Sequence, residues 1–173
     1  MAIDRLKRPM AATRMAATAR QLLDASTVCA IATVQQMAHV NAAYFAWSPE
    51  FDVVWLSEPL AKHSRNIRAN DSVGVTVYDS SQTWGGPDHG IQLFGAAHEA
   101  RRQDVEYAEN LYAKRFSDYH EDELSAYRFY LFRPRRLKLF DERTLGGGEF
   151  VTARIGARGR LTWERTEIYR SHP

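Results

Sequence analysis

The chain has 173 residues, of which 45% are hydrophobic and 25% are charged, and its formal net charge is +2. This composition excludes a disordered chain, and the length suits one ordinary domain with its own hydrophobic core. Because Lys and Arg are scattered along the chain, the charge does not point to a nucleic-acid partner. We expect a single domain over residues 1–173.

Cys29 is the only cysteine, so an intrachain disulfide is excluded. It lies in an apolar run, which favours a buried and unreactive thiol. No apolar stretch approaches the roughly 20 residues of a membrane-spanning helix, and the N-terminal segment lacks the apolar core of a signal peptide. We therefore expect a cytoplasmic protein with no membrane partner.

The first half of the chain begins with a predicted helix over about residues 11–25, whose apolar residues recur at helical spacing. Alternating or continuous apolar runs then predict strands at residues 28–34, 39–47 and 53–56. The last of these is apolar on both faces, as in a strand buried on both sides. A short helix is predicted from about Pro59 to Ala69, because proline suits the first helical turn.

The second half continues with a strand at residues 73–77, a loop at 79–90 around Trp84, and a strand at 91–99. An amphipathic helix follows over about residues 104–116. Further strands are predicted at 127–132, 137–140 and 150–155, with a solvated junction at residues 133–136 and a hairpin turn at 156–159 leading into residues 161–163. Seven or eight strands without regular βαβ alternation predict a mostly antiparallel barrel decorated by helices.

Several kinds of catalytic centre are excluded by their missing motifs. The chain lacks GxSxG, HExxH, CxxC and GxxxxGK[ST], and its six histidines do not fall at metal-ligand spacings, so no metal site is expected. The three glycines at 146–148 lie between strands and indicate a turn. Catalytic residues stay unassigned. Tyr44, His63 and Trp84 are the only candidates for an acid, a base or an aromatic side chain that covers a bound ligand.

The segment Ser57–Ser64 is a candidate phosphate site. A strand ends there and a helix begins, so free first-turn amides lie close to an ammonium, an imidazole and two hydroxyls. A basic, solvated helix is the alternative interpretation. A second candidate binding site is the strand at residues 39–47, where the small side chains of Ala42 and Ala43 leave the main chain accessible to a flat aromatic ligand. Small residues that make room for a packed helix explain it equally well.

Taken in order, these pieces resemble the FMN-binding split β-barrels related to pyridoxamine 5'-phosphate oxidase, over roughly residues 18–150. The segments that carry the resemblance are Asn41–Phe45, Val54–Ser57, Ala61–Ile67, Asn70–Val75, Gly90–Gly95, Ala113–Phe116, Leu137–Asp141 and Thr144–Gly146. The resemblance implies a mostly β, antiparallel split barrel with peripheral helices. It also implies a homodimer that holds two FMN molecules in clefts between its subunits.

The resemblance assigns cofactor-binding positions residue by residue. A main-chain wall along the flavin ring would be formed by Asn41, Ala42, Ala43 and Tyr44 and continued by Leu56 and Ser57. Lys62 and His63 would face the phosphate, and Gly90 to Gln92 of the partner subunit would close the site. The implied function is that of an FMN-dependent oxidoreductase acting on a small molecule, with NADH or NADPH as a possible reductant.

Two alternatives stay open at this point. One is a non-catalytic module of the same fold that holds haem or a flavin, and the other is a deazaflavin-dependent reductase. Ala61 stands where the first of two phosphate-binding cations is common in the family. A C-terminal substrate-binding arginine motif has no counterpart after Trp163. Both departures argue against pyridoxamine phosphate itself as the substrate.

Overall fold

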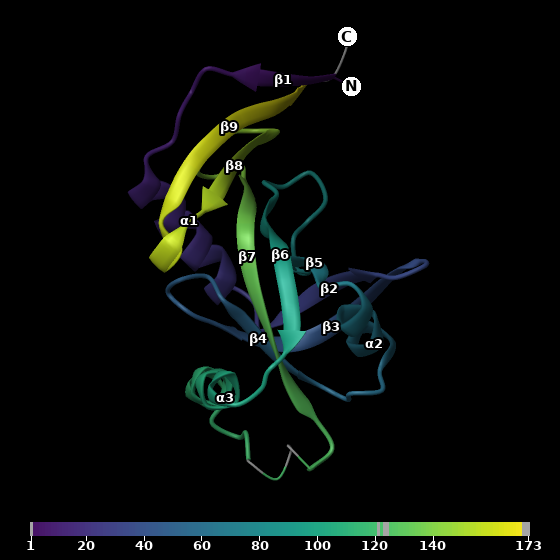
Figure 1. Ribbon diagram of the computed structural model, residues 1–173. Coiled ribbons are helices and arrows are strands. Elements are labelled where there is room, and N and C mark those ends of the chain that lie inside the picture. Colours follow the sequence, from purple (N-terminus) through teal and green to yellow (C-terminus); the bar gives the residue numbers. More distant parts are fainter. Residues whose placement is uncertain (1, 121, 123–124, 171–173) are drawn as a thin grey trace. The chain divides into compact units, whose positions relative to one another are not determined.

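The computed structural model describes residues 2–120, 122 and 125–170 (Figure 1). Among these residues the chain packs as two compact units. Unit 1 takes residues 2–26, 76–93 and 135–170, and unit 2 takes residues 27–75 and 94–134. Three strands contribute residues to both units, and the two units are described separately below.

The described residues form three helices, one short 3-10 helix and nine strands. The helices are α1 (Ala12–Asp24), α2 (Lys62–Ala69), α3 (Gln103–Arg115) and the 3-10 helix η2 (Ala157–Gly159). The strands are β1 (Ala2–Leu6), β2 (Val28–Val34), β3 (Ala38–Trp47), β4 (Val53–Ser57), β5 (Ser72–Tyr78), β6 (His89–Glu99), β7 (Arg128–Asp141), β8 (Glu149–Ile155) and β9 (Leu161–Arg170).

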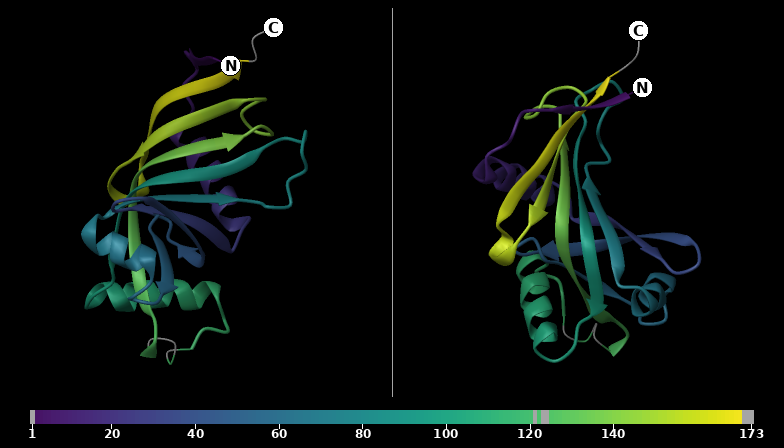
Figure 2. Two further views of the ribbon diagram at one scale, coloured as in Figure 1. Left: turned by 90° about the vertical axis from the view of Figure 1, so that its right-hand side faces the viewer. Right: turned by 45° about the horizontal axis from the view of Figure 1, so that its top comes forward.

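The strands form one sheet in the order β1-β9-β8-β7-β4-β3-β2-β5-β6, and β6 pairs again with β7. The second pairing closes β7, β4, β3, β2, β5 and β6 into a six-stranded antiparallel barrel. Figure 2 shows the long strands β6 to β9 side by side. The predicted fold class, a mostly β split barrel with peripheral helices, is confirmed.

Unit 1 contains α1 and the β8–β9 hairpin. The predicted apolar face of α1 is buried, and it consists of Met15, Ala19, Leu22 and Leu23. The hairpin turns at η2, where the sequence predicts a turn, and β9 then runs well beyond the predicted end at Trp163. β1 is an additional strand that the sequence pattern did not reveal, and it pairs antiparallel with β9 along the edge of the sheet.

Unit 2 has a core between α3 and the strands β3, β4 and β7. Its buried members include Val54 and Leu131 from the strands and Ala108 and Tyr112 from α3. The predicted inward face of this helix is therefore confirmed. β4 is buried on both sides as expected, since Val53, Val54 and Trp55 have no exposed surface.

Two predicted boundaries are wrong. Residues 128–141 form one continuous strand, although the sequence predicts two strands with a junction between them. Pro134 is tolerated because β7 changes partner around it, pairing with β4 up to Phe132 and with β8 from Arg136 onward. A Cβ built on Gly95 would overlap the Arg133 carbonyl and Pro134, so this glycine permits the close approach of β6.

The second correction concerns the start of α2, which is Lys62 and not Pro59. The residues before it form a turn, in which the amide of Ala61 donates to the carbonyl of Glu58. The carbonyls of Pro59 and Leu60 accept hydrogen bonds from the guanidinium groups of Arg68 and Arg65 at 2.6 and 2.5 Å. These side chains return onto the turn and hold it outside the helix.

Cys29 lies on β2, and only 2% of its surface is exposed. The predicted burial is confirmed, and burial raises the pKa of the thiol to about 12, which disfavours the reactive thiolate. Among the helices of the described residues, none is long and apolar enough to span a membrane.

Candidate functional site

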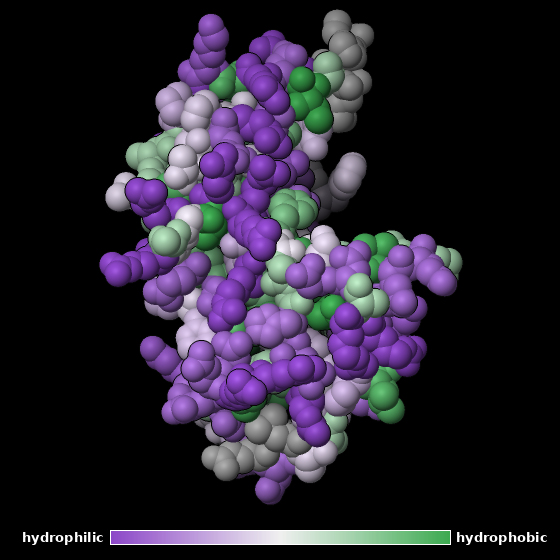
Figure 3. Space-filling view, viewed as in Figure 1, coloured by the Kyte–Doolittle hydropathy of each residue, from purple (hydrophilic) through white to green (hydrophobic). Residues whose placement is uncertain are grey.

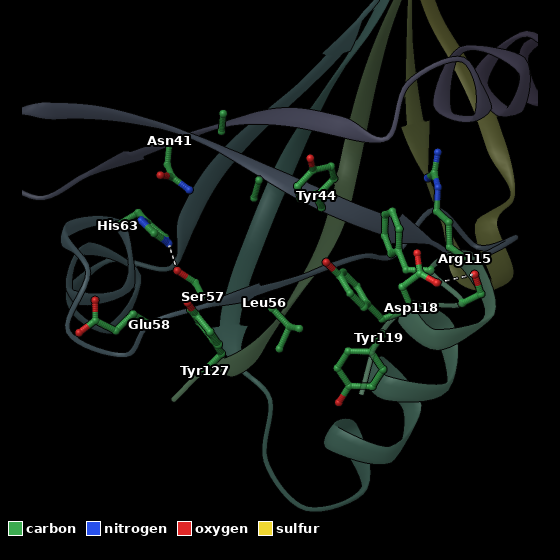
Figure 4. A pocket seen from close by; sticks show the side chains of 15 residues that line it. Asn41, Tyr44, Leu56, Ser57, Glu58, His63, Arg115, Asp118, Tyr119 and Tyr127 are labelled. Atoms are coloured by element: carbon green, nitrogen blue, oxygen red, sulfur yellow. Dashed lines mark hydrogen bonds between the residues drawn. The ribbon is translucent and has the colours of Figure 1, made fainter. Parts of the chain in front are cut away.

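Unit 2 contains a cavity of about 880 Å³, a volume within the range of small-molecule sites. Its walls come from β3, the end of β4, the start of α2 and the C-terminal end of α3 with the residues that follow (Figure 4). The lining residues are Asn41, Ala42, Ala43, Tyr44, Leu56, Ser57, Glu58, His63, Tyr112, Arg115, Phe116, Ser117, Asp118, Tyr119 and Tyr127. Seven of them are among the cofactor-binding positions predicted from the sequence.

The cavity lies where β3 and β4 separate. On one edge, Asn41–Tyr44 pair antiparallel with β2. On the opposite edge, the described register with β4 covers only residues 45–47 and ends at the pair Phe45↔Trp55. β4 continues to Ser57 as a partner of β7. The strand edge of Asn41–Tyr44 that faces away from β2 is therefore left without a strand partner in the described structure.

Strand geometry decides which main-chain groups face this opening. The amide of Phe45 donates to the carbonyl of Thr27, so the main-chain groups of Phe45 point toward β2. Their direction alternates from one residue to the next, so the N–H and C=O groups of Ala42 and Tyr44 point to the opposite edge. The opening thus offers a donor and an acceptor from each of these two residues. The methyl side chain of Ala42 adds little bulk beside them.

The wall opposite β3 is aromatic and comes from the C-terminal end of α3. The rings of Tyr112 and Phe116 lie 4.6 Å apart, and Tyr119 meets Tyr112 edge-on at 5.6 Å. Phe116 also contacts Tyr44 across the cavity, with 5.9 Å between the ring centroids. A planar ligand that enters this space would meet aromatic rings on one side and the open strand edge on the other.

Arg115 is the cationic side chain among the residues that line the cavity. Its guanidinium carbon lies 4.6 Å above the centre of the Phe45 ring, so the charge packs against an aromatic face. Figure 4 shows Arg115 and Asp118 on the α3 side of the cavity, across from Asn41 and Ser57. The sequence did not reveal this wall. A dense set of aromatic residues over 112–127 is the signal that could have indicated it.

Ser57 and His63 form the polar part of the opposite side. The hydroxyl oxygen of Ser57 lies 2.5 Å from Nε2 of His63, and both side chains are buried. The His63 ring stacks parallel to His39 at 6.2 Å and meets Tyr130 edge-on at 6.4 Å. Burial, and secondarily the neighbouring His39, lower the pKa of His63 below its ordinary value. The imidazole is therefore neutral at neutral pH.

Lys62 has a different position from His63. It is exposed at the first residue of α2 and lies outside the set of residues that line the cavity. The first-turn amides of α2 have no intrahelical acceptor, as in every α-helix, and no side chain caps them. Ser64 donates to the carbonyl of Glu58 at 2.8 Å and fixes the turn before the helix. The predicted contact of Lys62 and His63 with a phosphate stays a prediction.

Gly90 and Gln92 belong to unit 1. A Cβ built on Gly90 would overlap the ring of Phe140, so the glycine is required by packing within this unit. Gln92 lines a separate cavity of about 230 Å³ together with Lys138 and Phe150. The closing of a flavin site by these residues from a partner subunit remains a prediction.

Trp84 lies at the tip of the β5–β6 loop and is fully exposed. The tip is a tight turn in which the amide of Gly86 donates to the carbonyl of Thr83, and Gly85 supplies the positive φ of 81° that this turn requires. Trp84 thus stands on an ordered turn. Its predicted place over a flavin ring stays a prediction.

The described residues contain no group of three or more His, Cys, Asp or Glu side chains that could hold a metal ion. His172, one of the six histidines, lies outside the described residues. The chemistry of the cavity comes from aromatic walls, an open main-chain edge, a neutral Ser–His pair and the charged side chains of Glu58, Arg115 and Asp118. Such a set suits a planar organic ligand that carries its own donors and acceptors.

Comparison with solved structures supports the fold. A heme binding protein from Mycobacterium smegmatis is 17% identical, with a TM-score of 0.61, over 92% of this chain and 60% of that chain. A protein related to general stress protein 26, of the pyridoxine phosphate oxidase family, from Clostridium acetobutylicum is 11% identical, with a TM-score of 0.60, over 82% and 95%. The heme storage protein HutZ from Vibrio cholerae is 16% identical, with a TM-score of 0.58, over 70% and 91%.

Comparison of the sequence with protein families is more specific. No curated protein matches the chain. The family model described as pyridoxamine 5'-phosphate oxidase matches residues 15–141, which is more than half of the chain. The matched region runs from α1 to the end of β7 and includes every residue that lines the large cavity of unit 2. The chain therefore belongs to the pyridoxamine 5'-phosphate oxidase family.

Proposed function

We propose that this protein binds FMN in the large cavity of unit 2 and acts as a flavin-dependent oxidoreductase on a small molecule. The observation that carries the proposal is the open edge of β3, where the main-chain groups of Ala42 and Tyr44 face an aromatic-walled cavity. A bound flavin would supply the hydride and electron chemistry, and the protein would supply orientation and a partly apolar site.

The chemistry of the strand edge favours a flavin over haem. The pyrimidine side of a flavin carries alternating carbonyl and N–H groups, which complement the exposed main-chain donors and acceptors of Ala42 and Tyr44. The porphyrin rim has no such pattern, and haem iron needs an axial ligand. Nε2 of His63, the imidazole of the cavity, is already within 2.5 Å of the Ser57 hydroxyl.

Haem is the second candidate, because two structurally similar proteins are described as heme-binding and heme-storage proteins. Haem binding without turnover would also use an aromatic cavity of this size. A deazaflavin shares the hydrogen-bonding edge of FMN and is a third ligand to be separated by experiment. We propose FMN because it matches both the main-chain edge and the aromatic wall.

At its other end, the flavin would extend toward the start of α2. The free first-turn amides and the exposed ammonium of Lys62 would meet the phosphate there. The reductant we propose is NADH or NADPH. Hydride transfer requires contact between the two rings, so the nicotinamide would dock over the flavin ring itself.

We also propose a homodimer, supported by an apolar face of the β2–β3 ribbon. The cross-strand pairs Val28↔Tyr44, Ala30↔Ala42, Ala32↔Val40 and Val34↔Ala38 share one side of the ribbon, and all eight side chains are apolar or aromatic. Val40 and Tyr44 are 66% and 61% exposed. Figure 3 shows hydrophobic residues at the end of this ribbon. An exposed apolar face of this kind is typical of a protein–protein interface.

The test of FMN binding targets the main-chain donor directly. Ala42→Pro removes the N–H that faces the opening but keeps the bonds to β2, which other residues make. Val40→Pro is the matched control, because Val40 has the same strand parity but lies outside the cavity lining. FMN is titrated into each protein and flavin fluorescence is followed.

We expect Ala42→Pro to weaken FMN binding at least tenfold relative to Val40→Pro, while both variants retain the wild-type melting temperature within a few degrees. Equal affinities in the two variants would show that the Ala42 main chain does not hold the ligand. An absence of FMN binding in the wild-type protein would overturn the proposed function itself.

A further inference from the structure

The strands β7, β8 and β9 of unit 1 have one buried side and one side that bears charged residues. The buried side carries Leu137, Leu139 and Val151, and α1 lies on that side, where its Arg14 lines a cavity together with Val151. Because side chains alternate along a strand, the other side carries the cross-strand pairs Arg136↔Arg154, Lys138↔Thr152 and Phe140↔Phe150. The side chains of Arg136 and Arg154 are 52% and 69% exposed. We call this side of β7, β8 and β9, with the small cavity at its end, the charged face.

The half of the charged face nearer the β8–β9 turn has an excess of positive charge. Its cations are Arg136, Lys138, Arg154 and Arg165. The carboxylate of Glu164 lies between Arg136 and Arg154, at 2.9 and 3.3 Å from their Nε atoms, so one acid balances two guanidinium groups. Among the described residues, Lys138 takes part in no ion pair, and its ammonium therefore adds uncompensated charge to this half.

The other half of the charged face has an excess of negative charge. Asp88 and Glu142 line the cavity of about 230 Å³ at this end of β7. Glu142 accepts hydrogen bonds from the main-chain amides of Asp88 and Gly148 at 3.2 and 2.6 Å, which fix its carboxylate, whereas Asp88 is exposed. Glu167 is a third carboxylate, with Arg5 of β1 directly across from it. Positive and negative charge are therefore segregated along the strands of this face.

A face with this distribution of charge is complementary to itself. A two-fold axis perpendicular to the sheet brings the basic half of one copy opposite the acidic half of the other, and each contact then forms twice. The middle of the face is aromatic, since Phe140 pairs with Phe150 and the ammonium of Lys138 lies 3.7 Å from the centre of the Phe150 ring. An aromatic centre between charged ends is typical of protein interfaces. A polyanion would meet the acidic half as well as the basic half, so the charges favour a second copy of the chain.

We propose that the charged face contacts the same face of the second copy in the homodimer proposed above, with the Arg154 end of one copy opposite the Asp88 end of the other. The inference rests on the proposed homodimer and is independent of FMN binding. The subunits would then be held by complementary charges as well as by the apolar face of the β2–β3 ribbon. Their association should therefore depend on the sign of individual charges and on salt.

Two charge reversals test the contact by complementation between chains. Arg154→Glu leaves Glu164 paired with Arg136, and Asp88→Lys changes an exposed side chain, so both variants should fold. By analytical ultracentrifugation, we expect each variant alone to self-associate about tenfold or more weakly than the wild-type protein. An equimolar mixture should recover the wild-type affinity. In the mixed dimer the new carboxylate lies opposite the new ammonium, and the native Arg154 and Asp88 meet at the other contact.

Arg20→Glu is the control, because it makes the same charge change on α1, on the opposite side of the sheet, and should leave the association unchanged. Wild-type affinity in both reversal variants would overturn the proposal, as would a mixture that associates no more tightly than the separate variants. A monomeric wild-type protein would contradict the homodimer itself and this contact with it. The two failures are therefore distinguishable, and neither depends on whether FMN is bound.

The salt dependence of the wild-type protein covers the case in which a reversal variant fails to fold. Salt screens exposed charges, so the dissociation constant of the dimer should rise about threefold or more from about 0.05 M to about 0.5 M sodium chloride. An interface held by apolar contacts alone would keep its affinity or tighten at high salt. A dissociation constant that stays constant or falls over this range would overturn the proposal.

Discussion

Tyr44 and Leu56 lie next to Phe45↔Trp55, the last registered pair of β3 and β4, and the described register does not extend to them. Both residues instead line the cavity, Tyr44 from an open strand edge and Leu56 from a strand that continues along β7. The separation of two strands at one residue pair thus creates both the space and the free main-chain groups of the candidate site.

The aromatic wall gives a first prediction. Phe116→Ala removes the ring that lies between Tyr44 and Tyr112, and we expect FMN affinity to fall about tenfold through lost stacking and apolar contact. Tyr107→Ala is the control, since Tyr107 lies on the same helix but outside the cavity lining. Isothermal titration calorimetry measures the affinity of both variants for FMN. Equal affinities would show that α3 does not contact the ligand.

The start of α2 gives a second prediction. Lys62→Glu places a carboxylate beside the proposed phosphate position, so the variant should lose FMN during gel filtration while keeping its circular dichroism spectrum. Lys114→Glu makes the same charge change in the last turn of α3, outside the cavity lining, and should retain the flavin. Full flavin occupancy in both variants would place the phosphate elsewhere.

The strands of the barrel could be predicted because their side chains alternate and their boundaries contain turn residues. The continuity of β7 could not be predicted, because a proline such as Pro134 usually indicates the end of a strand. Its tolerance depends on the change of partner strand and on the close approach of Gly95, which are tertiary features. β1 was missed because its pairing with β9 joins the two ends of the sequence.

The candidate site was predictable along β3 and β4 and not along α3. Small residues and a strand-to-helix transition are local signals, and three of the residues that they single out, Ala42, Ala43 and Ser57, line one cavity. Tyr112 reads as a core position of an amphipathic helix, and it is indeed largely buried. The helix that contains Tyr112 also faces β3 across a cavity. This arrangement depends on packing between distant segments of the chain, which a periodic sequence pattern does not predict.

Gly90 gives a third prediction, which concerns stability. Gly90→Ala should destabilise the protein by about 1–3 kcal/mol, because the added methyl group meets the Phe140 ring. Gly147→Ala is the control, since no atom lies within 4 Å of the added methyl group, and a change within about 0.5 kcal/mol is expected. Urea denaturation measures both free energies of unfolding. Equal stabilities would contradict the packing role of Gly90.

The fourth prediction concerns pH. The pKa of His63 in the folded protein lies below its ordinary value of 6.5, which the unfolded chain regains. Between these two pKa values the unfolded chain binds more protons than the folded chain, so protonation of His63 favours unfolding. The contribution of the neutral His63 to stability is therefore complete above about pH 6.5 and is lost as the pH falls toward the folded-state pKa. His63→Gln should flatten that part of the stability profile. A variant that follows the wild-type profile below pH 6.5 would rule out His63 as its origin.

Assembly gives a fifth prediction. We expect a two-fold homodimer that buries on the order of 2,000 Å² or more in total, with the apolar face of the β2–β3 ribbon in its interface. Val34→Glu introduces a charge into this face and should shift the protein toward monomers in light scattering. Ile3→Glu makes a comparable change on β1 and should leave the dimer intact. A monomeric wild-type protein at micromolar concentration would exclude this assembly.

The most direct test of the central claim is the visible absorption spectrum of the purified protein, recorded before and after incubation with equal concentrations of FMN and haemin and removal of free ligand. Our account predicts the two bands of an oxidised flavin, in a stoichiometry of one FMN per chain, bleached under anaerobic conditions by NADH or NADPH. A Soret band with no flavin bands, or a protein that takes up neither ligand, would contradict it.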